Sequence, residues 1–415
     1  MSLEKDIDED KGVLIVGASH AGSQAAVSLR QAGYLGPITL LGDELDLPYH
    51  RPPLSKDFII GSKEIRDILL RPETAYQTAN IELRLGEHVT EIDRKSKAIL
   101  TKNREIIKYE TLILATGARA RGLNIPGANT DKVFYLRNAH DVRAIRKASK
   151  PGKRAVIIGG GYIGLETAAS LKKQGLKVTV LEAMDRILKR VTAPVISDFY
   201  RRIHSEEGVK IVESEMASLI EESEGDLIVH STNGSAYPAD FVIAGIGIVP
   251  NTEMASDADL ETSNGVVINE YCQTSDPSIY AIGDVSWHYN PIYNTHLRLE
   301  SVPNATEQAK TAAGHICGKP KPYNALPWFW SDQFNLKLQI AGLFQGFDDI
   351  VVRGDPEGTE RSFSVFYFKG DNFLAVDAVN SPKAFMMSRM VLTKGQKLNK
   401  KVLSDTSADL KSAVI

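Results

Sequence analysis

Two stretches of the chain repeat one pattern of apolar and polar positions. In each, a short apolar run leads into a glycine-rich turn, and an alanine- and leucine-rich stretch follows that ends near another glycine. The three parts fall at Lys11–Ile15, Gly17–Gly22 and Gly33 in the first stretch, and at Arg154–Ile158, Gly159–Gly164 and Gly175 in the second. A short apolar run, a glycine turn and a longer helical pattern are typical of a strand, a turn and a helix. The sequence therefore predicts the same βα unit twice.

The glycine spacing in both units suits a dinucleotide. The first glycine allows a tight turn, the second lets the backbone approach a pyrophosphate, and the third lets the helix pack on the strand. An acidic residue that can bind a ribose should follow the next strand: Asp43 and Glu44 follow Ile38–Leu41, and Glu182 follows Lys177–Leu181. One glycine fingerprint alone is weak evidence, but the full set occurring twice predicts two dinucleotide sites.

Ser19 departs from this pattern, because it stands where the middle glycine of the first fingerprint should be. Its Cβ and hydroxyl either crowd a pyrophosphate or donate a hydrogen bond to it. The alternative is an ordinary turn serine.

Length and composition indicate a multi-domain enzyme. A chain of 415 residues suits two or three domains, and a net charge of -3 predicts no general attraction to nucleic acid or anionic lipid. No apolar run reaches the roughly 18–20 residues of a membrane span. The start of the chain is unlike a signal peptide because it is acidic, with Glu4, Asp6, Asp8, Glu9 and Asp10. We therefore expect a cytoplasmic, bacterial-type protein.

Cysteine and histidine usage bears on metals and redox chemistry. The two cysteines, Cys272 and Cys317, are far apart in the chain, so neither a disulfide framework nor a thiolate metal site is expected. The nine histidines are scattered, and His288 and His296 lack further ligands at metal-binding spacing. We expect no metal.

Several further segments carry a family resemblance. Thr111–Gly117 and Thr274–Asp284 resemble the strands that return the chain to FAD in two-dinucleotide flavoprotein reductases. The whole chain resembles the putidaredoxin reductase-like family, the ferredoxin and rubredoxin reductases of bacterial oxygenase systems. The matching stretches are Pro48–Lys56, Gly159–Glu166, Ala244–Asn251, Glu300–Asn304 and Pro327–Gln333, of which Pro48–Lys56 is the most specific.

The resemblance implies an α/β fold with two Rossmann-like domains and a C-terminal α+β domain. The FAD-binding domain would comprise residues 12–118 and 251–325, the NAD-binding domain residues 119–250, and the C-terminal domain residues 326–415. The strand-rich Phe363–Phe368 and the alternating run near Leu374–Val379 suit a sheet in this last domain.

The resemblance also implies specific cofactor contacts. Asp284 would bind the ribityl chain of FAD, and Glu182 would favour NADH over NADPH, although Arg186 is near enough to weaken that preference. The remaining positions are Gly17, Ser19, Ala21, Gly22, Asp43, Glu44, Arg51, Lys56, Val89, Ala115, Thr116, Gly117, Arg137, Gly283, Val302 and Trp330 toward FAD, and Gly159, Gly161, Tyr162, Ile163, Gly164, Glu166 and Gly247 toward NAD.

Lys56 and Glu166 are the candidate catalytic residues. In the family, the residue matching Lys56 lies near the reactive edge of the flavin, and the one matching Glu166 lies near the nicotinamide. The alternatives are a loop lysine and a first-turn glutamate favoured by the helix dipole. The alternative role for Trp330 is that of a core aromatic residue, and the alternative for Val89 and Val302 is that of ordinary core residues.

The expected reaction follows from these cofactors. Because no closely spaced cysteine pair is present, electrons should leave the flavin directly and singly, to a small iron–sulfur protein ([2Fe–2S] ferredoxin or rubredoxin) that feeds an oxygenase such as a haem monooxygenase. The lysines around Lys310 and in Lys394–Lys401 form either a solvated face or the docking patch for this iron–sulfur protein. We expect a monomer or weak dimer with no nucleic-acid or membrane partner.

The alternative functions share every cofactor motif. They are an NADH oxidase, a monodehydroascorbate reductase, a nitrite reductase component, and a non-enzymatic NADH-sensing protein like apoptosis-inducing factor.

Overall fold

The computed structural model describes residues 12–223 and 225–415. Lys11 and the acidic residues before it lie outside this range. The described chain divides into two units, the first made of residues up to 50, 65–119 and 249–325, and the second of residues 51–64, 120–248 and 326–415. Within the described residues, no helix is both long and apolar enough to cross a membrane.

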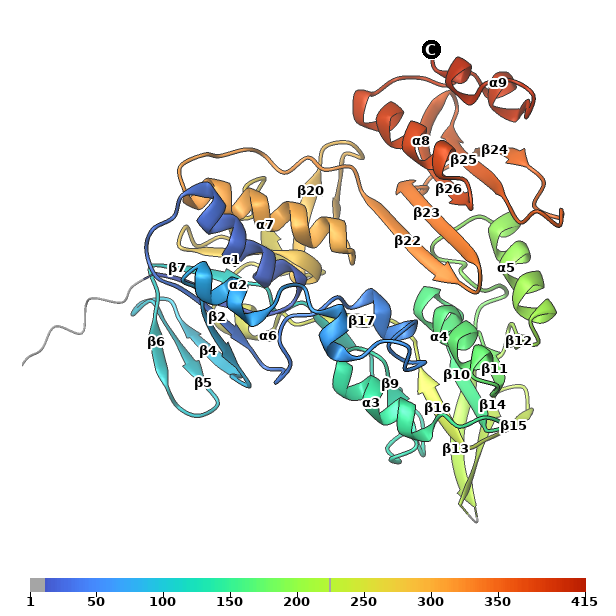
Figure 1. The fold of residues 1–415 in the computed structure, drawn as a ribbon, viewed down its shortest axis with the longest axis horizontal. Helices are drawn as coiled ribbons and strands as arrows, with labels where there is room; N and C mark the ends of the chain where they lie inside the picture. Colours follow the sequence, from blue (N-terminus) through green and yellow to red (C-terminus); the bar gives the residue numbers. More distant parts are fainter. Residues whose placement is uncertain (1–11, 224) are drawn as a thin grey trace, which may run out of the picture. The chain divides into compact units, whose positions relative to one another are not determined.

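A five-stranded parallel sheet forms the centre of the first unit. Its strand order is β19 (Ile279–Ala281), β7 (Thr111–Leu114), β1 (Val13–Val16), β2 (Ile38–Gly42) and β3 (Glu82–Leu85). Helices α1 (His20–Ala32) and α7 (Val302–Ile316) lie side by side (Figure 1) and share one hydrophobic core with these strands. Helix α1 ends at Gly33, which adopts the left-handed conformation (φ 98°). The predicted βα unit is confirmed.

Smaller elements complete the first unit. Two three-stranded sheets comprise β4 (Val89–Asp93), β5 (Ala98–Thr101) and β6 (Ile106–Lys108), and β18 (Val266–Ile268), β20 (Ser286–Asn290) and β21 (Thr295–Leu297). The short helices are η2 (Ile65–Ile68), α2 (Glu73–Thr78), α6 (Glu253–Asp257) and η3 (Gly283–Val285). The chain passes between the units within β8 (Ala118–Ala120) and β17 (Ile248–Pro250), and also after residues 50, 64 and 325.

The second unit contains the second predicted βα unit, in a sheet that is again fully parallel. Its order is β12 (Lys210–Val212), β11 (Lys177–Leu181), β10 (Arg154–Ile158), β16 (Phe241–Ala244) and β9 (Val133–Tyr135). The accompanying elements are η1 (Pro52–Ser55), α3 (Ala139–Ala148), α4 (Tyr162–Lys173), α5 (Pro194–Glu206) and the antiparallel strands β13 (Ala217–Ser223), β14 (Asp226–Ser231) and β15 (Ala236–Ala239).

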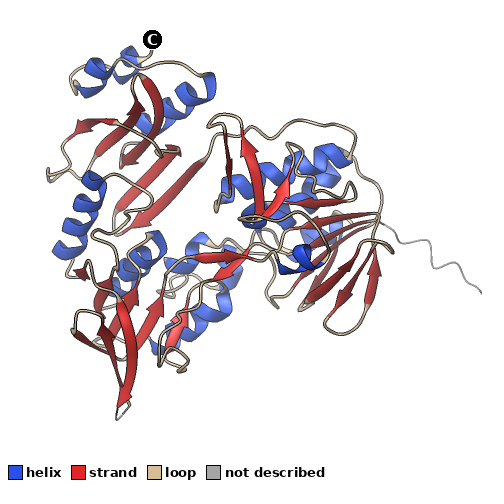
Figure 2. Ribbon diagram, turned by 180° about the vertical axis from the view of Figure 1, so that it is seen from behind, coloured by secondary structure: helices blue, strands red, loops and turns tan. Residues whose placement is uncertain are grey.

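The last 90 or so residues form an antiparallel sheet with helices, as the expected α+β class requires (Figure 2). The strand order is β22 (Trp328–Gln333), β23 (Leu336–Gly342), β26 (Asn372–Val379), β25 (Phe363–Lys369) and β24 (Asp349–Gly354), and the helices are α8 (Pro382–Lys394), α9 (Lys400–Ser404) and η4 (Leu410–Ala413). The predicted strands are present, and in β26 the polar residue Asp377 is buried with its apolar neighbours.

Candidate cofactor and active site

The first glycine loop is shaped by contacts that leave no room for side chains. Gly17 has φ 113°, and an added Cβ would lie 2.1 Å from the carbonyl oxygen of Ala115. A Cβ on Gly22 would lie 1.9 Å from the carbonyl oxygen of Gly17. Both positions therefore require glycine, and the loop delivers the N-terminus of α1 to the carboxyl edge of the sheet.

Ser19 is compatible with this loop. Its φ of -104° is ordinary for any residue, and the matching Gly161 has φ -81°. No described atom lies within 4 Å of a Cβ added to Gly161. The middle position thus demands no special backbone conformation, and Ser19 makes no side-chain capping bond to α1.

Three predicted segments meet at the carboxyl ends of neighbouring strands in the first unit. Ala115, Thr116 and Gly117 follow β7, and Gly283 and Asp284 follow β19. A Cβ on Gly283 would be 3.0 Å from the Cβ of Ala21 in α1. Ligands of open parallel sheets bind outside these strand ends, so this edge is a suitable cofactor cradle.

Two residues that support this cradle, Asn251 and Gln308, were not predicted from the sequence. The amide of Asn251 donates to the Thr116 carbonyl (2.8 Å), and the Thr116 hydroxyl donates to the Asn251 carbonyl (3.1 Å). On α7, Gln308 Oε1 accepts from the backbone N–H of Gly283 (2.7 Å). The sequence signal that could have indicated Asn251 is its place in Ala244–Asn251, one of the stretches that carry the family resemblance.

The acidic position of the first unit differs from that of the second. Gly42 stands at the position that Glu182 occupies in the second unit, so the acidic residues Asp43 and Glu44 follow one and two positions later in the chain. Asp43 is exposed. Glu44 accepts a 2.5 Å hydrogen bond from the Tyr49 hydroxyl. The two acids thus differ, because Glu44 is engaged by Tyr49 and Asp43 faces solvent.

Two apolar positions assigned to FAD also lie in the first unit. Val89 is buried in its core, and Val302 is the half-buried first residue of α7.

The second fingerprint repeats the glycine geometry of the first. A Cβ on Gly159 (φ 114°) would lie 2.4 Å from the Gly245 carbonyl oxygen, and one on Gly164 would lie 2.1 Å from that of Gly159. Glu182 fastens this loop, because its carboxylate accepts 2.8 Å hydrogen bonds from the backbone N–H groups of Gly160 and Met184.

The other positions assigned to NAD differ in how open they are. Ile163 is 46% exposed in the first turn of α4, and Gly247 (φ 107°) has open space around it among the described atoms. Tyr162 instead packs against Phe329, with ring centroids 5.1 Å apart, and burial raises its pKa.

Arg186 is hydrogen-bonded within the second unit. Its guanidinium donates to the Ser197 hydroxyl (2.6 Å) and to the Thr192 carbonyl (2.9 Å). A role for Arg186 toward a 2′-phosphate would require it to give up these bonds.

Lys56 and Glu166 are in direct contact. Lys56 Nζ lies 2.6 Å from Glu166 Oε2, and their side chains are 19% and 2% exposed. Glu166 also accepts hydrogen bonds from the hydroxyls of Ser55 (2.5 Å) and Ser331 (2.7 Å). A buried carboxylate needs such partners, and here it has three.

Two more residues assigned to FAD, Arg51 and Arg137, lie together in the second unit. Arg51 donates to the Arg137 carbonyl at 2.7 Å. Trp330, on β22, is half-buried, and its ring centroid is 5.7 Å from that of Trp328.

Comparison with known proteins identifies the chain. The family model "Pyridine nucleotide-disulphide oxidoreductase" matches residues 11–309, and "Reductase C-terminal" matches residues 328–414. The chain belongs to the pyridine nucleotide-disulphide oxidoreductase family.

Relatives match over nearly the whole chain. Putidaredoxin reductase of Pseudomonas putida is 42% identical, with 98% of both chains covered. The ferredoxin reductase subunit of a Sphingobium sp. 5,5'-dehydrodivanillate O-demethylase is 43% identical, covering 96% of this chain and 97% of the relative. A crystal structure of a covalent putidaredoxin reductase–putidaredoxin complex matches with a TM-score of 0.94, 42% identity and 98% coverage of both chains.

Membership of this oxidoreductase family implies FAD and NAD(H) as cofactors. The two cradles fit these groups, because each combines closely packed glycines, a helix N-terminus for a pyrophosphate and a carboxylate for a ribose. The predicted family, fold class and cofactors are confirmed.

This family member has no pair of cysteines to carry electrons as a disulfide. Cys272 and Cys317 are both free thiols. Burial raises the pKa of Cys272, so the reactive thiolate is disfavoured.

Proposed function

We propose that this enzyme oxidises NADH and delivers the electrons singly to a small iron–sulfur protein, a [2Fe–2S] ferredoxin or a rubredoxin, that serves an oxygenase. A bound flavin accepts a hydride and releases single electrons. The observation that carries the proposal is the whole-chain match to reductases named for putidaredoxin and ferredoxin, in a chain that lacks a cysteine pair.

Within this proposal, FAD occupies the carboxyl edge of the first parallel sheet and NAD the glycine loop of the second. Glu182 selects NADH, since its carboxylate suits a ribose diol and repels a 2′-phosphate. We assign Glu166 to the nicotinamide and Lys56 to the flavin edge, as a buried ion pair whose charges stabilise one another. We further propose a cytoplasmic protein that is a monomer or weak dimer.

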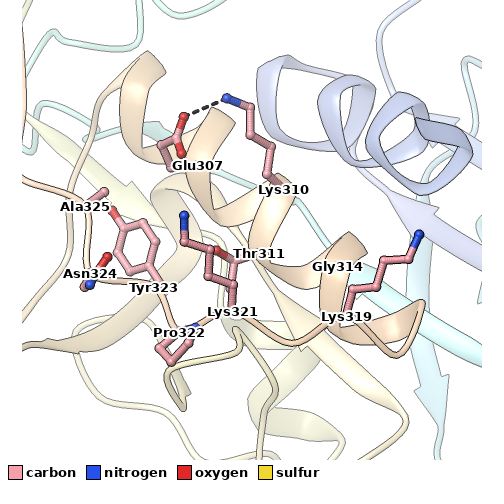
Figure 3. A pocket seen from close by; sticks show the side chains of 10 residues that line it. All are labelled: Glu307, Lys310, Thr311, Gly314, Lys319, Lys321, Pro322, Tyr323, Asn324 and Ala325. Atoms are coloured by element: carbon pink, nitrogen blue, oxygen red, sulfur yellow. Dashed lines mark hydrogen bonds and ion pairs between the residues drawn. The ribbon is translucent and has the colours of Figure 1, made fainter. Parts of the chain in front are cut away.

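A pocket on the first unit is the proposed docking site for an acidic partner. It is lined by Glu307, Lys310, Thr311, Gly314, Lys319, Lys321, Pro322, Tyr323, Asn324 and Ala325 (Figure 3). Lys310 is half-exposed, and its Nζ lies 2.7 Å from Glu307 Oε1. A partner carboxylate therefore competes with Glu307 for this lysine.

Within the C-terminal segment Lys394–Lys401, Lys400 supports docking less well. Lys400 donates to Asp349 (2.8 Å) and to the Gly370 carbonyl (2.6 Å), so it holds neighbouring elements together.

An anaerobic acceptor assay tests the function. NADH oxidation is measured with a [2Fe–2S] ferredoxin, a rubredoxin, monodehydroascorbate and nitrite reductase as acceptors, and with oxygen in a separate aerobic run. Preferred turnover with an iron–sulfur protein supports the proposal. A higher catalytic efficiency with any other acceptor contradicts it, and slow turnover with all of them indicates an NADH-sensing protein.

A further inference from the structure

Ser331 and Gln333 belong to a family-like stretch in which only Trp330 was assigned a role. Both lie on β22 and are almost completely buried, at 0% and 1% exposed. Gln333 Nε2 lies 3.2 Å from Ser331 Oγ, and Gln333 Oε1 lies 2.8 Å from His204 Nε2. With the bond from Ser331 to Glu166, these side chains form one buried hydrogen-bonded chain.

The direction of every hydrogen bond in this chain follows from its carboxylate end. An ionised carboxylate only accepts hydrogen bonds, so the single hydroxyl proton of Ser331 points to Glu166. Ser331 can then only accept from Gln333, which must present its NH₂ group to Ser331 and its oxygen to His204. His204 must therefore carry its proton on Nε2.

The surroundings of His204 suit this state. The imidazole is fully buried, and burial lowers its pKa to about 4, so it is neutral at neutral pH. Its Nδ1 has no hydrogen-bond partner among the described residues. The ring of Phe334 packs edge-on to it, with centroids 5.0 Å apart.

We propose that His204, Gln333 and Ser331 form a polarised relay of donors that positions the Glu166 carboxylate beside Lys56 for the reaction with NADH. Ser55 and Lys56 bind one carboxylate oxygen of Glu166, and Ser331 binds the other. The relay therefore holds the carboxylate in place at both oxygens. The three residues are positioning residues, and their catalytic effect rests on the proposed role of Glu166.

Nuclear magnetic resonance of the full-length, FAD-loaded protein tests the polarity directly. With ¹⁵N-labelled histidine, and with His204→Gln to assign the signal, His204 should be protonated on Nε2, unprotonated on Nδ1, and neutral down to about pH 5. Protonation on Nδ1, or titration near the ordinary value of about 6.5, would overturn the relay.

Rapid-mixing kinetics test its effect on the reaction. Ser331→Ala should slow flavin reduction by NADH about tenfold or more, the effect expected for one lost hydrogen bond to a charged group, while the NADH dissociation constant changes little. Ser331→Thr should restore the rate, since it retains the hydroxyl. The matched control is Ser364→Ala, because Ser364 is a buried serine of the same sheet whose hydroxyl has no partner among the described residues.

The possible failures are distinguishable. The relay is overturned if Ser331→Ala reduces the flavin at the wild-type rate while Glu166→Gln is slow. This comparison requires that Ser331→Ala binds FAD and has the same melting temperature as the control Ser364→Ala. If Glu166→Gln itself is as fast as wild type, the proposed role of Glu166 is wrong, and the tautomer of His204 still decides whether the relay has the predicted polarity.

Discussion

The buried carboxyl of Asp377 should make the stability of the second unit depend on pH. Asp377 accepts hydrogen bonds from the Thr192 hydroxyl and, at 2.5 Å, from that of Tyr367. Tyr162 and Tyr200 are also close enough to feel its charge. Burial raises the pKa of Asp377 from 3.8 to about 6, and the two hydroxyl donors offset only part of that rise.

The sign and size of the effect follow from this shift. The folded protein binds the Asp377 proton more tightly than the unfolded chain does, so the contribution to stability is complete below about pH 3.8 and is lost as pH rises through about 6. A difference of about two pKa units corresponds to about 3 kcal/mol of unfolding free energy, or roughly 6–12 °C in Tm for a unit of this size.

Two buried histidines act in the opposite direction. Burial lowers the pKa of His204 and of His288 from 6.5 to about 4. Their contribution to stability is complete above about pH 6.5 and is lost as pH falls toward about 4. Because they act equally in the wild type and in an Asp377 variant, the difference between the two proteins isolates Asp377.

The assay is thermal unfolding of wild type and Asp377→Asn between about pH 4.5 and 8. Asparagine keeps the shape and an acceptor oxygen but does not titrate. Between about pH 4.5 and 8 the Tm of the variant relative to wild type should rise by roughly 4–8 °C, which corresponds to about 2 kcal/mol, because only about two thirds of the full effect falls within this range. Exposed Asp371→Asn should show no such trend. A difference that is constant, or that falls as pH rises, would refute the reasoning.

Three further predictions concern the cofactors and the partner. Purified protein should release FAD on heating, and Asp284→Ala should weaken FAD retention in dialysis because a ribityl hydroxyl loses a charged acceptor; release of FMN would contradict this assignment. Glu182→Ser should lower the preference for NADH over NADPH about tenfold in kcat/KM; wild-type efficiency equal with both cofactors would refute the assigned role of Glu182. Ferredoxin-coupled cytochrome c reduction should fall as salt rises and slow further in Lys310→Glu, while ferricyanide reduction and the exposed-lysine control Lys102→Glu stay unchanged. If Lys310→Glu loses both activities equally, Lys310 belongs to the cofactor site or the fold, and if it loses neither, docking occurs elsewhere.

Much of the fold could be predicted because it rests on local patterns. The strand, glycine and helix signals around Gly17 and Gly159 reflect contacts of 2.1–2.4 Å that any Cβ would make, so the sequence has few alternatives there. The buried side of β26 could not be predicted. Asp377 interrupts an apolar run like a solvent-facing residue. Its burial is explained by its hydrogen-bond partners, Tyr367 on the neighbouring strand β25 and Thr192, which is distant in sequence.

The candidate site was predicted unevenly for a similar reason. Lys56 and Glu166 stand in distinctive motifs, so a resemblance could pair them. The residues that support them could not be found this way, because a serine or glutamine in a strand has no periodic signature. Ser55 and Ser331 gain their roles only when segments more than 100 residues away bring Glu166 to them.

The interrupted first unit has a consequence for synthesis on the ribosome. Strand β7 is complete at Leu114, but its edge partner β19 begins at Ile279 and the covering helix α7 at Val302. At typical translation rates, that delay is on the order of ten seconds or more. Residues 120–248 emerge in the meantime, while the free edge of β7 and the apolar face of α1 stay exposed to other chains. The nascent N-terminal segment should therefore depend on chaperones until β19 and α7 have emerged.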